Sequence, residues 1–242
     1  MTTPLIEVED LHHHYDDGTA ALDGIDFKLH PGESVALLGA NGSGKTTFLL
    51  CLTGLLTGHG AARVCGLPVD KTNLPAIRRK LGIVFQDSES QLFMPTVLED
   101  VAFGPLNLGM DPVAAQLRAR EVLRLVGMEA VAAKAPYHLS AGEKKRVAIA
   151  GILAMQPDIL ALDEPTTFLD PPAQRSLIDL LRGLPQAKII VTHDIAFARA
   201  VSTRAVFFDR GKIVGEGPVD DLVRRFAWDP QVESPGHAAR YD

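Results

Sequence analysis

The stretch Gly39-Ala40-Asn41-Gly42-Ser43-Gly44-Lys45-Thr46-Thr47 decides how this chain folds. It fits the pattern G-x-x-x-x-G-K-[ST] and lies between an apolar run, Val35–Leu38, and a helical segment that begins near Lys45. A strand, a glycine-rich loop and a helix in this order form a phosphate-binding loop, because backbone N–H groups converge on phosphate oxygens and the helix dipole adds positive charge. The stretch therefore predicts a site for a nucleoside triphosphate.

Two side chains of this loop have roles that follow from their chemistry. Lys45 can reach the β- and γ-phosphates, and the Thr46 hydroxyl can bind Mg²⁺. An ordinary glycine turn in a βα unit is the alternative, but the strand and helix on either side favour the phosphate loop. The residues expected to contact the nucleotide here are Gly39, Ala40, Asn41, Gly42, Ser43, Gly44, Lys45, Thr46 and Thr47.

The composition is that of an ordinary globular protein, with 242 residues of which 46% are apolar and 22% charged. A net charge of −6 argues against a nucleic-acid partner, which usually requires a basic surface. The longest apolar run, Val147–Met155, falls short of the roughly 20 residues that span a bilayer. No N-terminal stretch has the layout of a secretory signal, and Cys51 and Cys65 are isolated. A link to a membrane would therefore have to come through a partner.

The order of apolar runs predicts an α/β lobe interrupted by a helical insertion. Strands are expected at Ile6–Tyr15, Ile25–His30, Val35–Leu38, Arg63–Cys65, Gly82–Phe85, Ile159–Leu162, Lys188–Val191 and Ala205–Phe208. Helices are expected from Lys45 to about Leu55, from a cap at Asn73 to Lys80, and at Thr96–Phe103, Pro112–Val126, Val147–Met155, Pro172–Leu184 and Asp194–Val201. The continuous apolar strands in the second half are typical of parallel strands covered on both faces. Residues 226–242 are expected to form a loosely held tail.

Two carboxylates follow the apolar run Ile159–Leu162, where a buried strand is expected to end. Ligands of open α/β sheets bind at the carboxyl ends of the strands, so Asp163 and Glu164 should face the phosphates. Asp163 can hold Mg²⁺ directly or through water, and Glu164 can orient and deprotonate the attacking water. Two solvated acids at a strand end are the alternative, which the upstream phosphate loop disfavours.

His193 and Gln86 also follow predicted strands. His193 is a candidate contact to the γ-phosphate that also fixes the attacking water, although a histidine there is by itself more often a capping or packing residue. The Gln86 amide can ligate Mg²⁺ or its water, and the segment after it can report the nucleotide state. We therefore expect Glu164, His193 and Gln86 to act in catalysis. Thr46, Gln86 and Asp163 are the expected metal ligands.

The stretch Leu139–Glu143 opens the buried helix and offers a second anion site, made of the Ser140 hydroxyl and the first N–H groups of that helix. One nucleotide in one fold does not need two such sites. Two copies arranged head to tail do, because each can supply its helix N-terminus to the other's γ-phosphate. We therefore expect a dimer, a homodimer or a pair with a paralogue, in which Ser140, Ala141, Gly142 and Glu143 contact the partner's nucleotide.

Six motifs in this order resemble the ATP-binding cassette (ABC) ATPase family, and they are Gly39–Thr47, Gln86, Leu139–Glu143, Ile159–Glu164, Leu169-Asp170 and His193. The likeness covers the chain from about Leu5 to Arg225 and implies ATP and Mg²⁺ as cofactors. It implies the ABC ATPase fold over residues 1–225, which has a P-loop NTPase core of mainly parallel sheet (1–86 and 158–225), an N-terminal antiparallel β subdomain and an α-helical subdomain inserted at about 87–157. It also implies that Tyr15 stacks on adenine, with packing at a strand end as the alternative.

Three residues depart from the family's pattern. The usual signature is Leu-Ser-Gly-Gly-Gln, whereas Ala141 here replaces the first Gly and Glu143 replaces Gln. A carboxylate in the first turn of a helix suits the dipole, so Glu143 is expected to point away from the phosphate. Phe168 stands where a glycine or a small residue is common. None of the three removes the N–H donors or the Ser140 hydroxyl, so we expect activity to survive.

The segment after Gln86 narrows the resemblance. The runs Asp87–Phe93 and Thr96–Pro105 are similar to ATPases of energy-coupling-factor importers, which take up cobalt, nickel or vitamins, and Glu143–Ala150 resembles the cobalt/nickel branch. The likeness implies a peripheral protein at the cytoplasmic face of the cell membrane. It also implies that Ser88–Phe93 form a short helix beside a groove, where a helix of the transmembrane subunit docks near Gln86–Phe93. A surface loop with Leu92 and Phe93 turned inward is the alternative.

Two other classes of function fit the sequence less well. Non-transport members of the same family, which act in DNA repair or on ribosomes, usually carry a long coiled-coil insertion or two cassettes, and neither is visible here. A small-molecule kinase would leave Leu139–Glu143 and His193 unexplained. The run His12–His14 suggests a metal site, but consecutive side chains on a strand face opposite sides, so a half-exposed strand is favoured instead.

Overall fold

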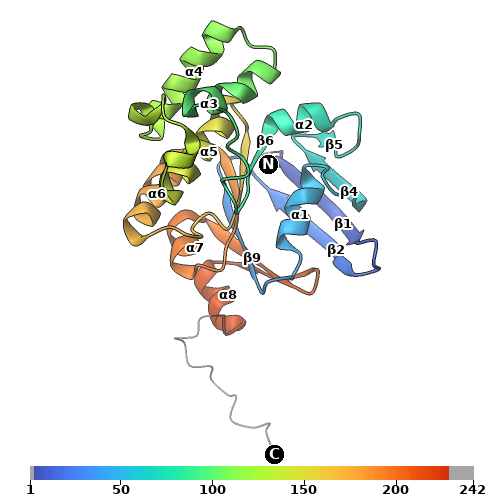
Figure 1. Ribbon diagram of the computed structural model, residues 1–242. Coiled ribbons are helices and arrows are strands. Elements are labelled where there is room, and N and C mark those ends of the chain that lie inside the picture. The colour runs from blue at the N-terminus through green and yellow to red at the C-terminus, as the bar shows by residue number, and fades with distance from the viewer. Residues whose placement is uncertain (1–2, 229–242) are drawn as a thin grey trace, which may run out of the picture.

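Two β-sheets and the helices around them make up the computed structural model, which describes residues 3–228 (Figure 1). The strands are β1 (Ile6–His14), β2 (Ala20–Leu29), β3 (Ser34–Gly39), β4 (His59–Val64), β5 (Leu67–Pro68), β6 (Leu81–Val84), β7 (Ile159–Asp163), β8 (Ala187–Val191), β9 (Arg204–Asp209) and β10 (Lys212–Gly217). The helices are α1 (Lys45–Leu52), α2 (Leu74–Lys80), α3 (Val97–Asn107), α4 (Pro112–Leu125), α5 (Ala141–Ala154), α6 (Pro171–Gly183), α7 (Ile195–Val201) and α8 (Val219–Arg225), with single 3-10 turns η1 (Glu129–Val131) and η2 (Pro136–His138).

The larger sheet has the strand order β10-β9-β3-β8-β7-β6, and every neighbouring pair is parallel except β9 and β10. All residues of β3, β7 and β8 are buried, as expected for parallel strands covered by helices on both faces. This arrangement confirms the predicted α/β core. Because β3, β6, β7 and β8 run in the same direction, the segments that follow them meet at one edge of the sheet.

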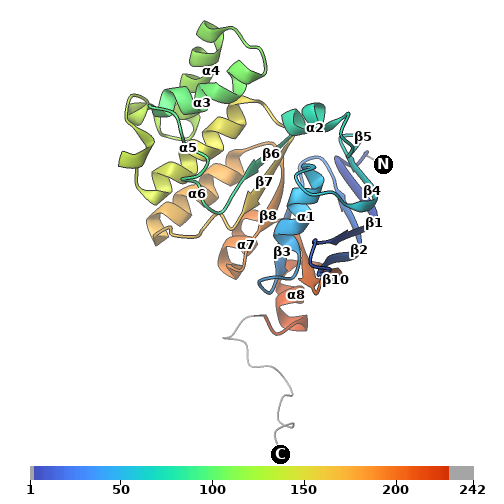
Figure 2. The same ribbon diagram turned by 45° about the vertical axis from the view of Figure 1, so that its right-hand side comes forward.

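The smaller sheet is antiparallel, in the order β2-β1-β4-β5, and confirms the expected N-terminal β subdomain. Helix α1 joins it to the larger sheet, and Figure 2 shows the helix between the two. Phe48 of α1 packs against Phe27 of β2 and Phe208 of β9, with ring centroids 5.3 and 5.7 Å apart. The helix that follows the phosphate loop is therefore anchored in the core of both sheets.

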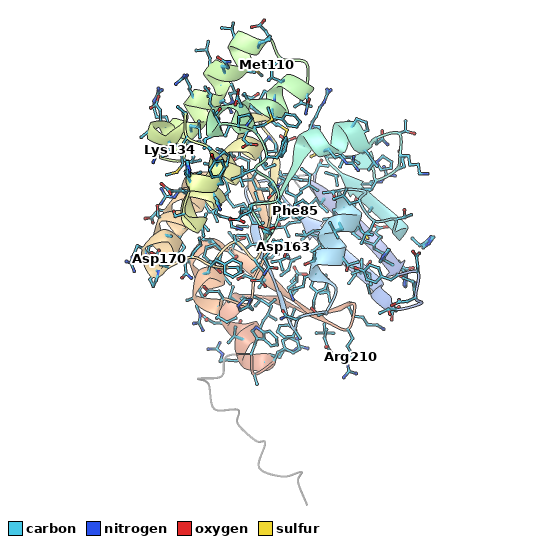
Figure 3. All side chains as sticks on the ribbon, viewed as in Figure 1. Phe85, Met110, Lys134, Asp163, Asp170 and Arg210 are labelled. Atoms are coloured by element: carbon cyan, nitrogen blue, oxygen red, sulfur yellow. The ribbon has the colours of Figure 1, made fainter. Side chains whose placement is uncertain are left out.

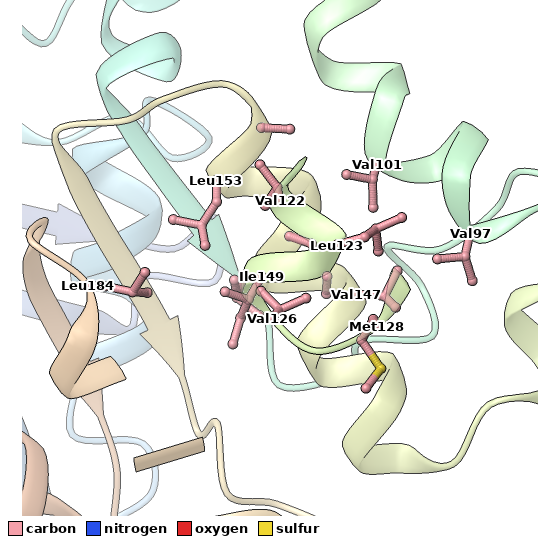
Figure 4. Packing of buried hydrophobic residues seen from close by; sticks show 14 of the residues in the cluster. Val97, Val101, Val122, Leu123, Val126, Met128, Val147, Ile149, Leu153 and Leu184 are labelled. Atoms are coloured by element: carbon pink, nitrogen blue, oxygen red, sulfur yellow. The ribbon is translucent and has the colours of Figure 1, made fainter. Parts of the chain in front are cut away.

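Helices α3, α4 and α5 form the inserted helical subdomain, as expected from the sequence. Their apolar faces meet in a cluster that includes Val101 of α3, Val122 and Leu123 of α4, and Val147 and Ile149 of α5 (Figure 4). The same cluster continues onto the buried strands β6 and β7 of the larger sheet. The start of α5 is therefore held rigidly against the core that carries the site.

Several element boundaries differ from the predicted ones. Strand β2 begins at Ala20, five residues before the predicted start, and α1 ends at Leu52 rather than near Leu55. The hairpin partner β10 and helix α8 were not predicted, since the two glycines and two charged residues of β10 hide its alternating pattern. None of the helices between residues 3 and 228 is long and apolar enough to span a bilayer.

The predicted cap of α2 is wrong. Asn73 occupies the N-cap position, but its side chain makes no capping hydrogen bond and instead donates to Pro68 O and the Asp70 carboxylate. The Asp70 carboxylate accepts from the backbone N–H groups of Thr72 and Asn73. An aspartate three residues earlier therefore shapes the turn that leads into the helix.

The expected helix at Ser88–Phe93 is also absent. The segment forms one turn, in which Gln91 N donates to Ser88 O and Leu92 N to Glu89 O. Phe93 N and Met94 N then donate to the buried Asp100 carboxylate of α3, which ends the turn. A side chain from α3 thus takes the N–H groups that a helix would have used.

The chain stays packed beyond the predicted start of the tail. The Phe226 ring stacks on Phe207 of β9 with centroids 4.1 Å apart, and Trp228 meets the same ring edge-on at 5.2 Å. The prediction of a loose tail is therefore wrong for residues 226–228. Its remainder, residues 229–242, lies outside the described residues.

Candidate active site

The phosphate loop connects β3 to α1 through backbone that only glycine can adopt. Gly39 and Gly44 have φ angles of +136° and +106°. A Cβ on Gly39 would lie 2.2 Å from Phe208 O, and one on Gly44 would lie 2.5 Å from Ala21 O. Gly44 is the N-cap of α1 and supplies no side-chain hydrogen bond, and the first turn has no acidic residue. The helix start is therefore left free for an anion.

Lys45 lies inside the curve of this loop. Its Nζ donates to Gly39 O and Ala40 O, both at 2.8 Å, and approaches Ser43 Oγ at 3.4 Å. Burial lowers the pKa of Lys45, and the charges of Glu164 and Asp163 oppose that shift. The ammonium is thus held at the phosphate loop with two carboxylates near enough to stabilise its charge.

Asp163 ends β7 and faces the phosphate loop. Its Oδ2 accepts a hydrogen bond from the Thr46 hydroxyl at 3.0 Å, whereas its buried Oδ1 has no partner within residues 3–228. Burial raises the pKa of this carboxyl. An unpartnered carboxylate oxygen beside a hydroxyl, with the Gln86 amide lining the same cavity, is a donor set that suits Mg²⁺. Phe85 and Asp163 follow the last pair of the β6–β7 ladder, Val84 and Leu162, and Figure 3 labels both at the centre of the molecule.

Glu164 follows Asp163 in an unusual backbone conformation. Its φ of +44° lies in the left-handed region, and its N–H donates to Val191 O of β8 at 2.9 Å. A non-glycine residue there costs about 1–2 kcal/mol, and such strain gathers at functional sites. The side chain is 11% exposed, and its Oε2 lies 2.9 Å from Nδ1 of His193, which is 66% exposed. The two predicted catalytic side chains therefore meet directly.

These segments enclose one cavity of about 370 Å³. Its lining residues are Tyr15, Thr19, Ala20, Ala21, Asn41, Gly42, Gly44, Lys45, Thr46, Thr47, Gln86, Asp163, Glu164 and Val191. Tyr15 is 41% exposed, and its hydroxyl lies 2.8 Å from that of Thr47, so an aromatic face stands at the end of the phosphate loop. His193 does not line the cavity and reaches it through Glu164. Gly39, Ala40 and Ser43 shape the loop through their contacts with Lys45.

The start of α5 is separate from this cavity. None of Ser140, Ala141, Gly142 and Glu143 lines it. Ser140 and Glu143 instead form a reciprocal capping box, in which Glu143 Oε2 accepts from Ser140 N and from the Ser140 hydroxyl, both at 2.8 Å. The expectation that Glu143 points away is therefore wrong. The Ser140 N–H also lowers the pKa of Glu143.

Residues that the sequence did not mark out support the segment around Gln86. Gln91 accepts from Phe85 N at 2.9 Å and donates to Ile83 O at 3.2 Å, which braces the end of β6. Lys145 of α5 is 2% exposed and donates to the carbonyls of Phe85 and Gln86. Burial lowers the pKa of Lys145 to about 8. The position of Lys145 next to the apolar helical run Val147–Met155 was the one sign in the sequence that this lysine could be buried.

His12 and His13, neighbours on β1, make different contacts. The buried His13 donates from Nδ1 to Thr57 O at 2.8 Å, whereas His12 lies 2.8 Å from Asp10 and 3.4 Å from Asp23. No group of three or more histidine, cysteine or acidic residues suited to a metal occurs between residues 3 and 228.

Comparisons with known proteins agree with this geometry. The family model for ABC transporters matches residues 22–167. An ABC transporter ATP-binding protein of Geobacter sulfurreducens is 50% identical over 223 residues, which are 92% of this chain and 90% of the relative. The energy-coupling factor transporter ATP-binding protein EcfA of Methanocaldococcus jannaschii is 47% identical over 219 residues, covering 88% and 78% of the two chains.

Two solved structures are similar to this chain over most of their length. CbiO1 of Clostridium perfringens, described as part of the ABC transporter complex CbiONQ, has a TM-score of 0.83 and 35% identity, covering 93% of this chain and 94% of that one. The ATP-binding cassette MJ0796, solved as a dimer in a post-hydrolysis state with ADP and Pi, has a TM-score of 0.78 and 30% identity, covering 88% and 98%. Since half of the residues are shared with a relative over nine tenths of its length, this chain belongs to the ABC transporter family and is an ATP hydrolase coupled to transport.

Proposed function

We propose that this chain is the energy-coupling ATPase of an energy-coupling-factor importer for cobalt or nickel, and that it works as a head-to-tail homodimer. The observation that carries the proposal is the joint similarity to EcfA of Methanocaldococcus jannaschii and to CbiO1, a part of the CbiONQ complex. The run Glu143–Ala150 favours the metal branch. An importer for a vitamin or another solute is the alternative. In either case the protein would be peripheral, at the cytoplasmic face of the cell membrane.

The cavity supports hydrolysis by direct transfer of the γ-phosphoryl group to water. Lys45 and the loop N–H groups stabilise negative charge on the β- and γ-phosphates. Thr46, Asp163 and Gln86 would hold Mg²⁺, which neutralises phosphate charge when bound. Glu164 accepts the proton of the water whose oxygen bonds to the γ-phosphorus, while the bond from that phosphorus to the bridging oxygen breaks and leaves ADP.

The separation of the α5 start from the cavity supports the dimer. A protomer cannot use Ser140 on its own nucleotide, whereas a partner facing the opposite way can present Ser140 to it. Phe168 adds to this argument, because its side chain is 82% exposed and its φ is +65°. A bulky aromatic residue held outward in the left-handed region is well explained by a protein surface that covers it in the dimer. The dimeric structures of MJ0796 offer a precedent.

An apolar cavity supports docking of a membrane subunit near Gln86–Phe93. It measures about 590 Å³ and lies between α2, α3, α5 and the turn, with Leu92, Phe103 and Ile152 among its lining residues. Phe93 is 61% exposed and packs edge-on against Phe103 at 4.9 Å. The exposed ring favours a docking surface over a loop with Phe93 turned inward. An amphipathic helix of the transmembrane subunit fits such a groove.

The Glu164→Gln variant tests the catalytic assignment. It should lose at least about 100-fold in turnover, because glutamine cannot accept the proton, and it should accumulate as an ATP-bound dimer. Steady-state hydrolysis and size-exclusion chromatography with light scattering measure the two effects. Hydrolysis at the parent rate would remove Glu164 from its role.

The Ser140→Arg variant tests the shared site. Hydrolysis should be lost while ATP binding to the isolated monomer stays unchanged, because Ser140 serves only the partner's nucleotide. A fluorescent nucleotide titrated at concentrations that keep the protein monomeric measures the binding. Equal loss of monomer binding would refute the head-to-tail arrangement.

Uptake measurements decide the solute. Cells that carry the parent chain should accumulate radiolabelled Co²⁺ or Ni²⁺ faster than cells that carry Glu164→Gln, with vitamin uptake equal in both. A difference confined to a vitamin would place the chain in the vitamin branch and reject the metal assignment.

A further inference from the structure

Two neighbouring lysines of α5 hold the segment that carries Gln86. Lys145 Nζ donates to Gln86 O at 2.9 Å and to Phe85 O at 3.2 Å. Lys144 Nζ forms an ion pair with the Glu89 carboxylate, three residues further on. The segment 85–89 is therefore attached to α5 at both ends.

The strand ladder does not hold the backbone of Gln86. The pairing of β6 with β7 ends at Val84 and Leu162, so Phe85 and Gln86 lie beyond the last pair. Within residues 3–228, no donor other than Lys145 bonds the carbonyl of either residue. Apart from the bond from Phe85 N to Gln91 Oε1, the backbone of these two residues is thus held by one ammonium group, which fixes both carbonyls.

Lys145 is also more deeply buried than its neighbours. It is 2% exposed, yet it is no part of the nucleotide cavity. A buried ammonium is unfavourable unless its protons are bonded, and the carbonyls of Phe85 and Gln86 meet that need. It lines a second cavity of about 310 Å³, shared with Gln86, Ala141 and Phe168. The side chain thus lies between the start of α5 and the segment that leads into the nucleotide cavity.

We propose that Lys145 is a positioning residue for ATP hydrolysis, which acts by fixing the Gln86 carbonyl so that the Gln86 amide faces the Mg²⁺ and water positions beside Asp163. The inference rests on the proposed role of Gln86. Helix α5 would then have two roles. Its N-terminus would contact the partner's phosphate, and Lys145, one turn later, would position the Gln86 amide of its own protomer.

Replacing Lys145 separates positioning from packing. Lys145→Met keeps the apolar stem but removes the donor, so kcat should fall at least about tenfold and the Mg²⁺ concentration for half-maximal rate should rise at least about fivefold. Nucleotide affinity measured in EDTA should stay within about twofold, because Lys145 does not line the nucleotide cavity. Lys145→Gln keeps an N–H donor and should recover part of both losses.

Lys188 offers a matched control. It is 6% exposed, and its Nζ donates to Leu184 O at 2.7 Å and Gln186 O at 2.8 Å, at the opposite end of β8 from the site. Lys188→Met should lower the thermal midpoint without moving the Mg²⁺ dependence. An equal change of Mg²⁺ dependence in both variants would reduce the effect of Lys145 to general packing and overturn the proposal.

A double-mutant cycle tests whether Lys145 acts through Gln86. In the Gln86→Ala background, Lys145→Met should reduce kcat by no more than about twofold further. A second full loss would show that Lys145 acts independently and would overturn the positioning role. If Gln86→Ala keeps the parent rate and Mg²⁺ dependence, the proposed role of Gln86 is wrong. If Gln86→Ala is defective but Lys145→Met has the parent rate and Mg²⁺ dependence, only the proposed role of Lys145 is wrong.

Discussion

Helices α1 and α5 each begin at an expected phosphate site, but their first turns are built in opposite ways. The N-cap of α1 is Gly44, which provides no side-chain bond, and no acidic residue follows it. The N-cap of α5 is Ser140, which is bonded to Glu143 in a reciprocal box. The first site has no side-chain cap, whereas at the second Ser140 N and Glu143 N are bonded within the box. A phosphate can enter the first from solution but meets the carboxylate of Glu143 at the second.

Both helices carry a buried lysine that donates to two carbonyls after a strand. Lys45 bonds Gly39 O and Ala40 O after β3, and Lys145 bonds Phe85 O and Gln86 O after β6. Lys45 lines the nucleotide cavity and can exchange its carbonyl partners for phosphate oxygens. Lys145 lies outside that cavity and keeps its partners. In our proposal the same interaction serves binding in one helix and support in the other.

Placing an alanine at the glycine of each helix start should give the largest contrast. Gly44→Ala should cost about 2–5 kcal/mol of folding stability and at least about 100-fold in ATP affinity, because its Cβ would strike Ala21 O. Gly142→Ala brings its Cβ to 3.1 Å from Ala173 Cβ and should leave monomer binding within about twofold. Nucleotide titration and urea unfolding measure both. Parent-like ATP binding by Gly44→Ala would remove the distinction.

Removing the cap of α5 should have a moderate effect. Ser140→Ala should lose about 1 kcal/mol of stability because Glu143 N loses its acceptor. Thr96→Ala is the matched control, since Thr96 caps α3 by the same bond to Glu99 N and lies outside the nucleotide cavity. Both variants should shift urea midpoints, but only Ser140→Ala should weaken ATP-driven dimerisation. Equal dimerisation of the two would show that the α5 start takes no part in it.

Neutralising the carboxylate at the α5 start should have a smaller effect. Glu143→Gln keeps the capping geometry but removes a charge that repels the incoming phosphate, so ATP-bound dimers should form about two- to fivefold more tightly at low salt. Sedimentation in the Glu164→Gln background measures the dimer constant. Glu99→Gln, the equivalent change at α3, should leave it unaltered. If Glu143→Gln leaves the dimer dissociation constant unchanged at low salt, the carboxylate does not compete with phosphate.

The smallest expected effect is the loss of folding stability at low pH when Glu143 is protonated. Since the pKa of Glu143 is held below its usual value, its stabilisation is present above the unfolded pKa and is lost as pH falls through the folded one. The parent should therefore lose about 0.5 kcal/mol more than Glu143→Gln between pH 6 and pH 3. Urea unfolding at both pH values checks this. An identical loss would show that the ionised form has no advantage at the helix start.

The open site could be predicted from the sequence because each of its parts follows a continuous apolar run. Gly39, Asp163 and Gln86 come directly after segments that had to be buried strands, and parallel strands bring their carboxyl ends to one edge. At the start of α5, Ser140 and Glu143 were predicted as site residues, but the hydrogen bonds between them were not predicted. The spacing Ser140-x-x-Glu143 is that of a capping box, and this local pattern was the signal that Glu143 turns back to Ser140.

The sequence does not say which lysine supports Gln86. Lys144 and Lys145 are adjacent and chemically alike, and only the packing of α5 against β6 decides which of them is buried. The turn at Ser88–Phe93 was mistaken for a helix because Asp100, a residue of α3, takes its last N–H groups. Contacts between residues far apart in the sequence do not alter the hydrophobic periodicity from which helices are predicted.

The packing of Trp228 has a spectroscopic consequence. It is the single tryptophan of the chain, and its ring meets Phe207, whose neighbour across the β3–β9 ladder is Leu38, one residue before the phosphate loop. Intrinsic indole emission would thus monitor the strand that delivers that loop, from the side away from the nucleotide. Nucleotide arrival could be followed as a change in this natural optical signal, with no dye attached to either helix.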